Sequence, residues 1–175
     1  IRRMMTVMIW GARGSHPTPL SPEAVRSKIA TAIQRVRPSD LESADTRERF
    51  LASLPEWLFG TSGGNTACVE VCLPRGQIIF DAGTGIIPLS QKELRQKTKR
   101  SEYHIFFTHF HYDHVQGFPF FLPAFNPNNH IHFYSPITSP GNVLSRQMYN
   151  PYFPIRMEDK MSPNMHTHEL TGNAT

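Results

Sequence analysis

The sequence predicts an α/β fold (an α+β arrangement being the close variant) built as a single domain over residues 1–175. At 175 residues the chain is long enough for one domain with a core, and short for two domains of usual size. Short β-prone runs alternate with helical patterns, and fifteen prolines indicate a loop-rich fold rather than a helical bundle. The apolar fraction of 39% and the charged fraction of 18% argue against global disorder.

The first half of the chain predicts a strand, a helical segment and a hairpin. Residues 4–10 (MMTVMIW) form an apolar, β-prone run that ends in a turn with two glycines. Residues 21–58 change to a helical pattern with Pro22 at a first helical position, so we expect a helical insertion there. Residues 67–73 and 77–81 then predict the two strands of a hairpin.

The second half continues with a helix and further strands. Residues 88–99 predict an exposed helix, and residues 103–108 (YHIFFT) are nearly continuously apolar, as expected of a strand buried on both faces. Residues 116–125 are rich in Phe and Pro, which favours core packing over the lining of a pocket. Residues 130–135 alternate like a strand, and the chain after residue 158 gives no strong signal.

Charge and cysteine content restrict the environment only weakly. The net charge of +4 would suit a phosphate-bearing partner, but acidic residues lie among the basic ones, which favours solvated helical faces. Cys68 and Cys72 would share one face of a strand roughly 13 Å apart, too far for a disulfide, so we expect buried reduced thiols. With no secretory pattern and no apolar run long enough to span a bilayer, we predict a cytoplasmic protein without a membrane partner.

A cluster of potential metal ligands follows directly on the strand predicted over residues 103–108. Its members are His109, His111, Asp113 and His114. Imidazole nitrogens and carboxylate oxygens are donors that zinc and related divalent ions prefer. In an extended loop His109 and His111 project to one side and can share one metal ion, while Asp113 and His114 turn towards a second position. The spacing therefore predicts a site for two divalent metal ions.

The segment 108–121 (THFHYDHVQGFPFF) resembles the signature of metallo-β-lactamase-fold hydrolases. Residues 11–15 (GARGS), 63–66 (GGNT), 80–85 (FDAGTG) and 151–154 (PYFP) look like motifs of one branch of that family. The branch includes ribonuclease Z, class II cyclic-nucleotide phosphodiesterases and the phosphodiesterase of phosphonate breakdown. The resemblance implies the metallo-β-lactamase αββα sandwich, of which this sequence covers the first half, so that the second half is expected to be absent.

The resemblance also implies roles for individual residues. His109 and His111 would bind the first metal, Asp113 and His114 the second, and Asp113 would orient the attacking water as the catalytic residue. Asp81 would support the cluster from behind the ligands, although a turn-forming Asp is an alternative. The metals would be Zn²⁺, with Mn²⁺ or Fe²⁺ as alternatives. In the family, a hydroxide held between the two metals attacks phosphorus or a carbonyl carbon.

The family completes its site with ligands from the second half of the fold, and no motif for them is present in this sequence. Asp159 lacks the context of a bridging aspartate, and His166 and His168 are expected in a loop or edge strand away from metal. His16, His104, His130 and His132 are expected to be structural or to face solvent. A half-fold would also leave one sheet face to be covered by the missing half or by a second copy, so we expect a homo-oligomer if the chain stands alone.

These observations favour a metal-dependent hydrolase that acts on phosphodiester bonds. Cyclic nucleotides, RNA ends and small phosphodiesters are all compatible substrates. The alternative is a catalytically incomplete metal-binding module with a regulatory or assembly role, because four ligands cannot complete two metal sites. Iron-dependent oxygen or sulfur chemistry, which some relatives perform, ranks below both.

Overall fold

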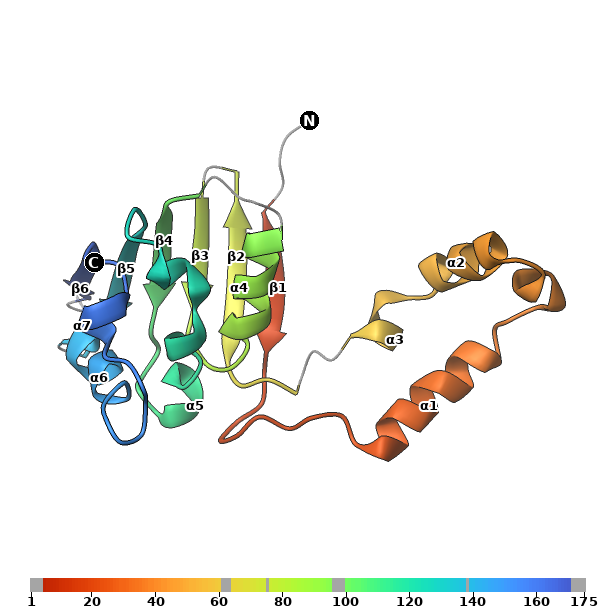
Figure 1. The fold of residues 1–175 in the computed structure, drawn as a ribbon, viewed down its shortest axis with the longest axis horizontal. Coiled ribbons are helices and arrows are strands. Elements are labelled where there is room, and N and C mark those ends of the chain that lie inside the picture. Colours follow the sequence, from red (N-terminus) through yellow and green to blue (C-terminus); the bar gives the residue numbers. More distant parts are fainter. Residues whose placement is uncertain (1–4, 61–63, 75, 96–99, 138, 171–175) are drawn as a thin grey trace, which may run out of the picture. The chain divides into compact units, whose positions relative to one another are not determined.

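The computed structural model describes residues 5–60, 64–74, 76–95, 100–137 and 139–170 (Figure 1). The chain divides into two compact units. The sheet unit comprises Ile1–Thr18 and Ser62–Thr175, and the helical unit comprises Pro19–Thr61. Each unit is described separately below.

The sheet unit contains a mixed sheet that has six strands in the described residues, in the order β1-β2-β3-β4-β5-β6. Strands β1, β2 and β3 are antiparallel neighbours, whereas β3, β4, β5 and β6 run parallel. The strands are β1 (Thr6–Gly11), β2 (Cys68–Leu73), β3 (Gly76–Phe80), β4 (Glu102–Phe106), β5 (His130–Ser135) and β6 (Met165–Glu169). An α/β fold is thus confirmed, with the predicted hairpin formed by β2 and β3.

Helices and short helical turns connect the parallel strands. In the described residues of the sheet unit they are α4 (Ile86–Arg95), α5 (Tyr112–Val115), η2 (Phe118–Phe120), η3 (Leu122–Phe125), α6 (Pro140–Arg146) and α7 (Met157–Lys160). Figure 1 shows α4, α5 and α6 in front of the sheet. The described part of this unit therefore has a helical layer on a sheet, which corresponds to one αβ half of an αββα sandwich.

The core lies between this helical layer and one face of the sheet. Successive strand residues point to opposite faces, so Ile79, Ile105, Ile131 and Phe133 share the covered face and are almost fully buried. Phe118 is fully buried among them, as the core-packing interpretation of residues 116–125 predicts. We call this side of the sheet the covered face.

The opposite side, which we call the open face, carries two rows of side chains that run across all six strands. The strand registers align the first row as Val7, Val71, Ile78, His104, His132 and His166. They align the second row as Ile9, Val69, Phe80, Phe106, Tyr134 and His168. Ile9 remains 61% exposed and Phe80 37% exposed, so this face is apolar on β1–β3, rich in aromatic rings and imidazoles on β4–β6, and incompletely covered.

Three expectations from the sequence need correction. The helix expected to be exposed over residues 88–99 begins at Ile86 and buries Leu89, because one of its sides packs on the sheet; residues 96–99 lie outside the described part. Strand β4 is fully buried on one face only, since His104 and Phe106 lie on the open face. Strand β6 was not expected as a clear strand, because its sequence MHTHE lacks an apolar alternation.

The two cysteines occupy β2 as predicted, both on the covered side and both free. Cys68 is fully buried and Cys72 is partly buried. Burial raises the pKa of the Cys68 thiol strongly and, together with the nearby carboxylate of Glu70, also raises that of Cys72. Both side chains are therefore protonated, unreactive thiols near neutral pH.

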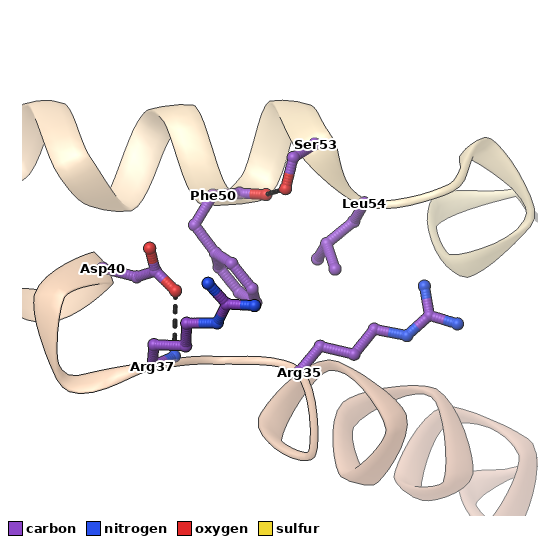
Figure 2. Close-up of a pocket in the computed structure, with 6 residues that line it drawn as sticks. All are labelled: Arg35, Arg37, Asp40, Phe50, Ser53 and Leu54. Atoms are coloured by element: carbon purple, nitrogen blue, oxygen red, sulfur yellow. Dashed lines mark hydrogen bonds between the residues drawn. The ribbon is translucent and has the colours of Figure 1, made fainter.

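The helical unit consists of the expected insertion. Its elements are α1 (Pro22–Ile33), η1 (Pro38–Leu41), α2 (Ala44–Ser53) and α3 (Glu56–Phe59). Ser21 caps α1 by accepting a hydrogen bond from the Ala24 amide at 3.2 Å, as a serine before Pro at the first helical position predicts. Figure 2 shows a small pocket in this unit, where Phe50 and Leu54 point from α2 and its end towards the segment of Arg35 and Arg37.

The described helices include none that is both long enough and apolar enough to cross a membrane.

Candidate metal centre

The predicted ligand cluster lies where the chain leaves β4 and enters the short helix α5. Strand β4 ends at Phe106, and α5 covers Tyr112–Val115, with His111 as its extended N-cap residue. The cluster is therefore at the carboxyl end of a parallel strand, the edge at which sites in layered α/β folds are built. The loop that follows β3 lies beside it, because the Ala82 amide donates to the His114 carbonyl at 2.7 Å.

Two glycines allow these loops to pack closely. A Cβ atom at Gly83 would lie 2.3 Å from the Asp113 carbonyl oxygen, and one at Gly117 would lie 2.1 Å from the Gly83 carbonyl oxygen. At both positions a backbone oxygen of the neighbouring loop occupies the space that a Cβ atom would need, so any larger residue would push the two loops apart. The Gly117 amide instead donates to the Ala82 carbonyl at 2.9 Å, which fixes α5 against the loop after β3.

Asp81 is buried behind the cluster and organises it. Its Oδ1 accepts hydrogen bonds from the Thr108 amide at 2.8 Å and from the Thr108 hydroxyl at 3.1 Å. Its Oδ2 is 2.8 Å from Nδ1 of His114. The backbone of Asp81 has a φ of 59°, in the left-handed region that Asp tolerates better than most residues, and such conformations concentrate at functional sites.

These contacts determine which ring nitrogens face the site. A carboxylate only accepts hydrogen bonds, so Nδ1 of His114 carries the proton and donates to Asp81. The Thr108 hydroxyl donates its hydrogen bond to Asp81. Its oxygen therefore accepts a hydrogen bond from Nδ1 of His109, at 3.0 Å. Nε2 of both rings is therefore left with a free lone pair, as in metal sites where the ligand histidine donates its other N–H to a neighbour.

Asp113 is held from the other side of the site. Its Oδ2 accepts a hydrogen bond from the Ser15 amide at 2.9 Å and lies 3.5 Å from Nε2 of His114. The Ser15 amide lowers the pKa of the Asp113 carboxyl, and the neighbouring His114 and His111 add to this effect. Asp113 is consequently an ionised carboxylate, the form that can bind a cation or accept a proton.

The four predicted ligands lie beside one another. The ring centroid of His109 is 4.5 Å from that of His111 and 4.0 Å from that of His114, and His114 in turn neighbours Asp113. Across the described residues, however, no group of three or more His, Cys, Asp or Glu side chains has an arrangement that could hold a metal ion. The donor types and free Nε2 atoms fit divalent ions, but the described set does not by itself complete a site.

The structure adds contributors that sequence reasoning missed. Thr108 links Asp81 to His109, and Ser15 reaches Asp113 from 98 positions away in the chain. Thr108 could have been noticed as a hydroxyl beside the first ligand, and Ser15 as part of the motif at residues 11–15, but only the fold shows that the Ser15 amide contacts Asp113. His166 and His168 lie on the edge strand β6, and their ring contacts are with β5.

Comparison with known proteins agrees with this geometry. Residues 61–133 match the family model described as the metallo-beta-lactamase superfamily, a segment that includes β2–β4, Asp81 and the whole ligand cluster. The chain carries a metallo-β-lactamase superfamily domain. Members of this superfamily typically bind metal ions and are often hydrolases.

The chain is also similar to one curated protein, which points to one branch of the superfamily. The chain is 30% identical over 112 residues to a ribonuclease Z of Haloarcula marismortui (strain ATCC 43049 / DSM 3752 / JCM 8966 / VKM B-1809). That alignment covers 57% of this chain and 35% of the relative, so the matched part spans about a third of the relative's length. The similarity to this branch of the superfamily is therefore distant and partial.

Proposed function

We propose that this metallo-β-lactamase superfamily domain contributes to a metal-dependent hydrolase acting on phosphodiester bonds. The observation that carries the proposal is the orientation of two histidines by Asp81 and Thr108, which directs Nε2 of His114 and His109 away from their protein partners. Histidines held in this way are prepared to bind metal before any metal arrives. Similarity to a ribonuclease Z supports the choice of phosphodiesters, with RNA or a small nucleotide as the substrate.

Each residue has a proposed role in this reaction. His109 and His111 would hold one divalent ion, Zn²⁺ or alternatively Mn²⁺ or Fe²⁺, and Asp113 and His114 would hold a second. Such ions supply Lewis acidity, which makes water a nucleophile near neutral pH and offsets charge on the phosphate. The ionised Asp113 would orient the attacking water and accept its proton, while Asp81 keeps His114 in one tautomer.

The test is hydrolysis of bis(p-nitrophenyl) phosphate by the longest native chain after metal removal and reloading with Zn²⁺ or Mn²⁺, with bound metal measured in parallel. Loss of an outer partner of a ligand typically costs about 10–100-fold in metal affinity or activity, so His111→Ala should reduce turnover at least about 100-fold. The matched control is His104→Phe, which removes a histidine on the open face and should leave turnover unchanged. Turnover unaffected by His111→Ala would exclude the mechanism.

A second substitution tests the support behind the ligands. Asp81→Asn keeps the shape of the side chain, and Asn also tolerates a backbone φ of 59°. The amide, however, has one oxygen that accepts hydrogen bonds, where the carboxylate has two. Either the Thr108 amide or Nδ1 of His114 then faces an NH₂ group. We expect Zn²⁺ affinity to fall about 10–100-fold in a chelator competition assay. Unchanged affinity would show that Asp81 only shapes the turn.

A second candidate function is a catalytically incomplete metal-binding or assembly module. It is favoured by the finding that no group of three potential ligands in the described part of the chain could hold a metal ion. The same measurement separates the two candidates. Metal uptake that depends on His111 without turnover by the longest native chain would favour the module, whereas turnover that depends on His111 would favour the hydrolase.

A further inference from the structure

A second group of histidines lies on the open face, on β5 and β6. His130 and His132 are two residues apart on β5, and His166 and His168 are two residues apart on β6, so each pair points to the same side of its strand. The parallel register places His132 opposite His166. Four imidazoles therefore lie side by side on two neighbouring strands, although the two histidines of β5 are far in sequence from the two of β6.

The ring nitrogens of these histidines approach each other across the strands. Nδ1 of His132 lies 3.1 Å from Nε2 of His168, and Nδ1 of His130 lies 3.3 Å from Nε2 of His166. A tetrahedral zinc ion with Zn–N bonds of about 2.0–2.1 Å separates its ligand nitrogens by about 3.3 Å. Each contact is a hydrogen bond in which one ring N–H donates to the other ring nitrogen, and a metal ion that replaced this proton would need nearly the same nitrogen spacing.

The surroundings of the four histidines favour the state with a bound metal ion over the state without one. The rings also stack, with centroids 4.7 Å apart for His132 and His166 and 5.3 Å apart for His132 and His168. Protonation of several such rings would bring like charges together, and the one carboxylate that the register places on this patch is Glu102, opposite His130. A metal ion uses the neutral form of the imidazoles and so removes the conflict.

We propose that the pairs His132/His168 and His130/His166 form a binding site for imidazole-preferring transition metal ions, separate from the cluster at residues 109–114. Imidazole suits Cu²⁺, Ni²⁺ and Zn²⁺, and the usual affinity order places Cu²⁺ first. Each pair supplies two protein ligands, and no group of three or more potential ligands in the described residues could hold a metal ion. Water completes the coordination, so these ions exchange readily.

The experiment removes the loop ligands first. In the full chain carrying His109→Ala, His111→Ala and His114→Ala, calorimetric titration with Cu²⁺ and Ni²⁺ should still show about one bound ion per histidine pair. Adding His132→Phe and His168→Phe, which keeps rings for stacking but removes nitrogen donors, should abolish about one of these ions. Because the loop histidines are absent throughout, this result does not depend on the proposed hydrolase function.

A matched control and a second measurement complete the test. Thr167→Ala changes β6 between the two histidines without removing a ligand, and should leave the binding curve unchanged. Electron paramagnetic resonance of the Cu²⁺-loaded chain, with His132 and His168 intact, should show coupling to imidazole nitrogen. This measurement does not require the Phe variants to fold. An unchanged number of bound ions after both Phe substitutions, an equal loss of binding in Thr167→Ala, or a Cu²⁺ spectrum without nitrogen coupling would each overturn the proposal.

Discussion

The two faces of the six-stranded sheet are built from the same strands but differ in what they bury. On the covered face of β5, Phe133 is 1% exposed and packs with Phe107 and Phe118. One residue later, Tyr134 lies on the open face, is partly exposed and stacks on Phe106 with centroids 4.2 Å apart. Adjacent residues of one strand therefore experience two different environments.

The difference also governs polar groups. Glu70 is buried on the covered side and has a partner for each oxygen: Trp10 and Lys92 contact Oε2, and Gln77 and Cys72 contact Oε1. The histidines of the open face contact mainly one another. A buried charge such as that of Glu70 is tolerated only when it is paired. The histidines of the open face are partly solvated, so water or a bound ion can serve as their hydrogen-bonding or coordinating partner.

The largest effect should come from truncating the covered face. Phe133→Ala removes a fully buried ring and leaves a cavity, so we expect a loss of about 3–5 kcal/mol in the free energy of unfolding. Tyr134→Ala, its neighbour on the open face, should cost about 1 kcal/mol, because the lost ring is partly exposed and contributes mainly its stacking. Urea unfolding followed by circular dichroism measures both.

Equal losses for the two variants would break the comparison. They would mean that Tyr134 is covered in solution, which is the outcome expected if the open face joins a second copy of the chain. Light scattering at tens of micromolar protein distinguishes the cases: association would accompany equal losses, whereas a clean monomer would count against the homo-oligomer expected if the chain stands alone.

The next largest effect concerns Glu70. Glu70→Ala leaves the Trp10 and Gln77 donors without their acceptor in a buried position and should destabilise the fold by about 2–3 kcal/mol at neutral pH. Burial alone would raise the pKa of Glu70, but hydrogen bonds from Cys72 and Trp10 and the charge of Lys92 outweigh it and lower the pKa below its ordinary value of 4.5.

The sign of the pH dependence follows from this lowered pKa. Below pH 4.5 the unfolded chain takes up a proton at Glu70 before the folded chain does, so the stabilisation is complete above that pH. It is lost as the pH falls through the lower folded value. Glu70→Gln should remove this component, and the difference between the two unfolding curves from neutral pH to below 4.5 isolates it from other carboxyls. A difference independent of pH would contradict the assignment.

The sequence carried the parts of the structure that depend on short-range pattern. The apolar runs predicted β1–β5, and the change to a helical pattern predicted the helices of the insertion. The cluster at residues 109–114 was found because its donor types and spacing are unusual in so short a segment. The metal-ligand roles of His109, His111, Asp113 and His114 stay predictions, as does the interpretation of the chain as one domain.

The missed parts depend on contacts between distant segments. Glu70 appears in the sequence as a polar residue in an apolar strand, and only the fold brings Trp10, Gln77 and Lys92 around it. Strand β6 has no apolar alternation of its own and exists because β5 offers a free edge for pairing. The two His-x-His segments, 130–132 and 166–168, likewise become neighbours only through that pairing.

The smallest predicted effect is the titration of His132, which tests how crowded the open face is. Burial, and then the neighbouring His104, His166 and His168, lower the pKa of His132 below its ordinary value of 6.5. His104→Phe keeps the ring that covers His132 but removes one charge, so the pKa should shift upward while burial still holds it below 6.5. The His132 ring signals, followed by NMR against pH in the presence of a chelator, measure the shift. No change would mean that burial alone sets the titration. In that case the imidazoles of β4–β6 act independently, and the open face differs from the covered face in exposure but not in coupling between its charges.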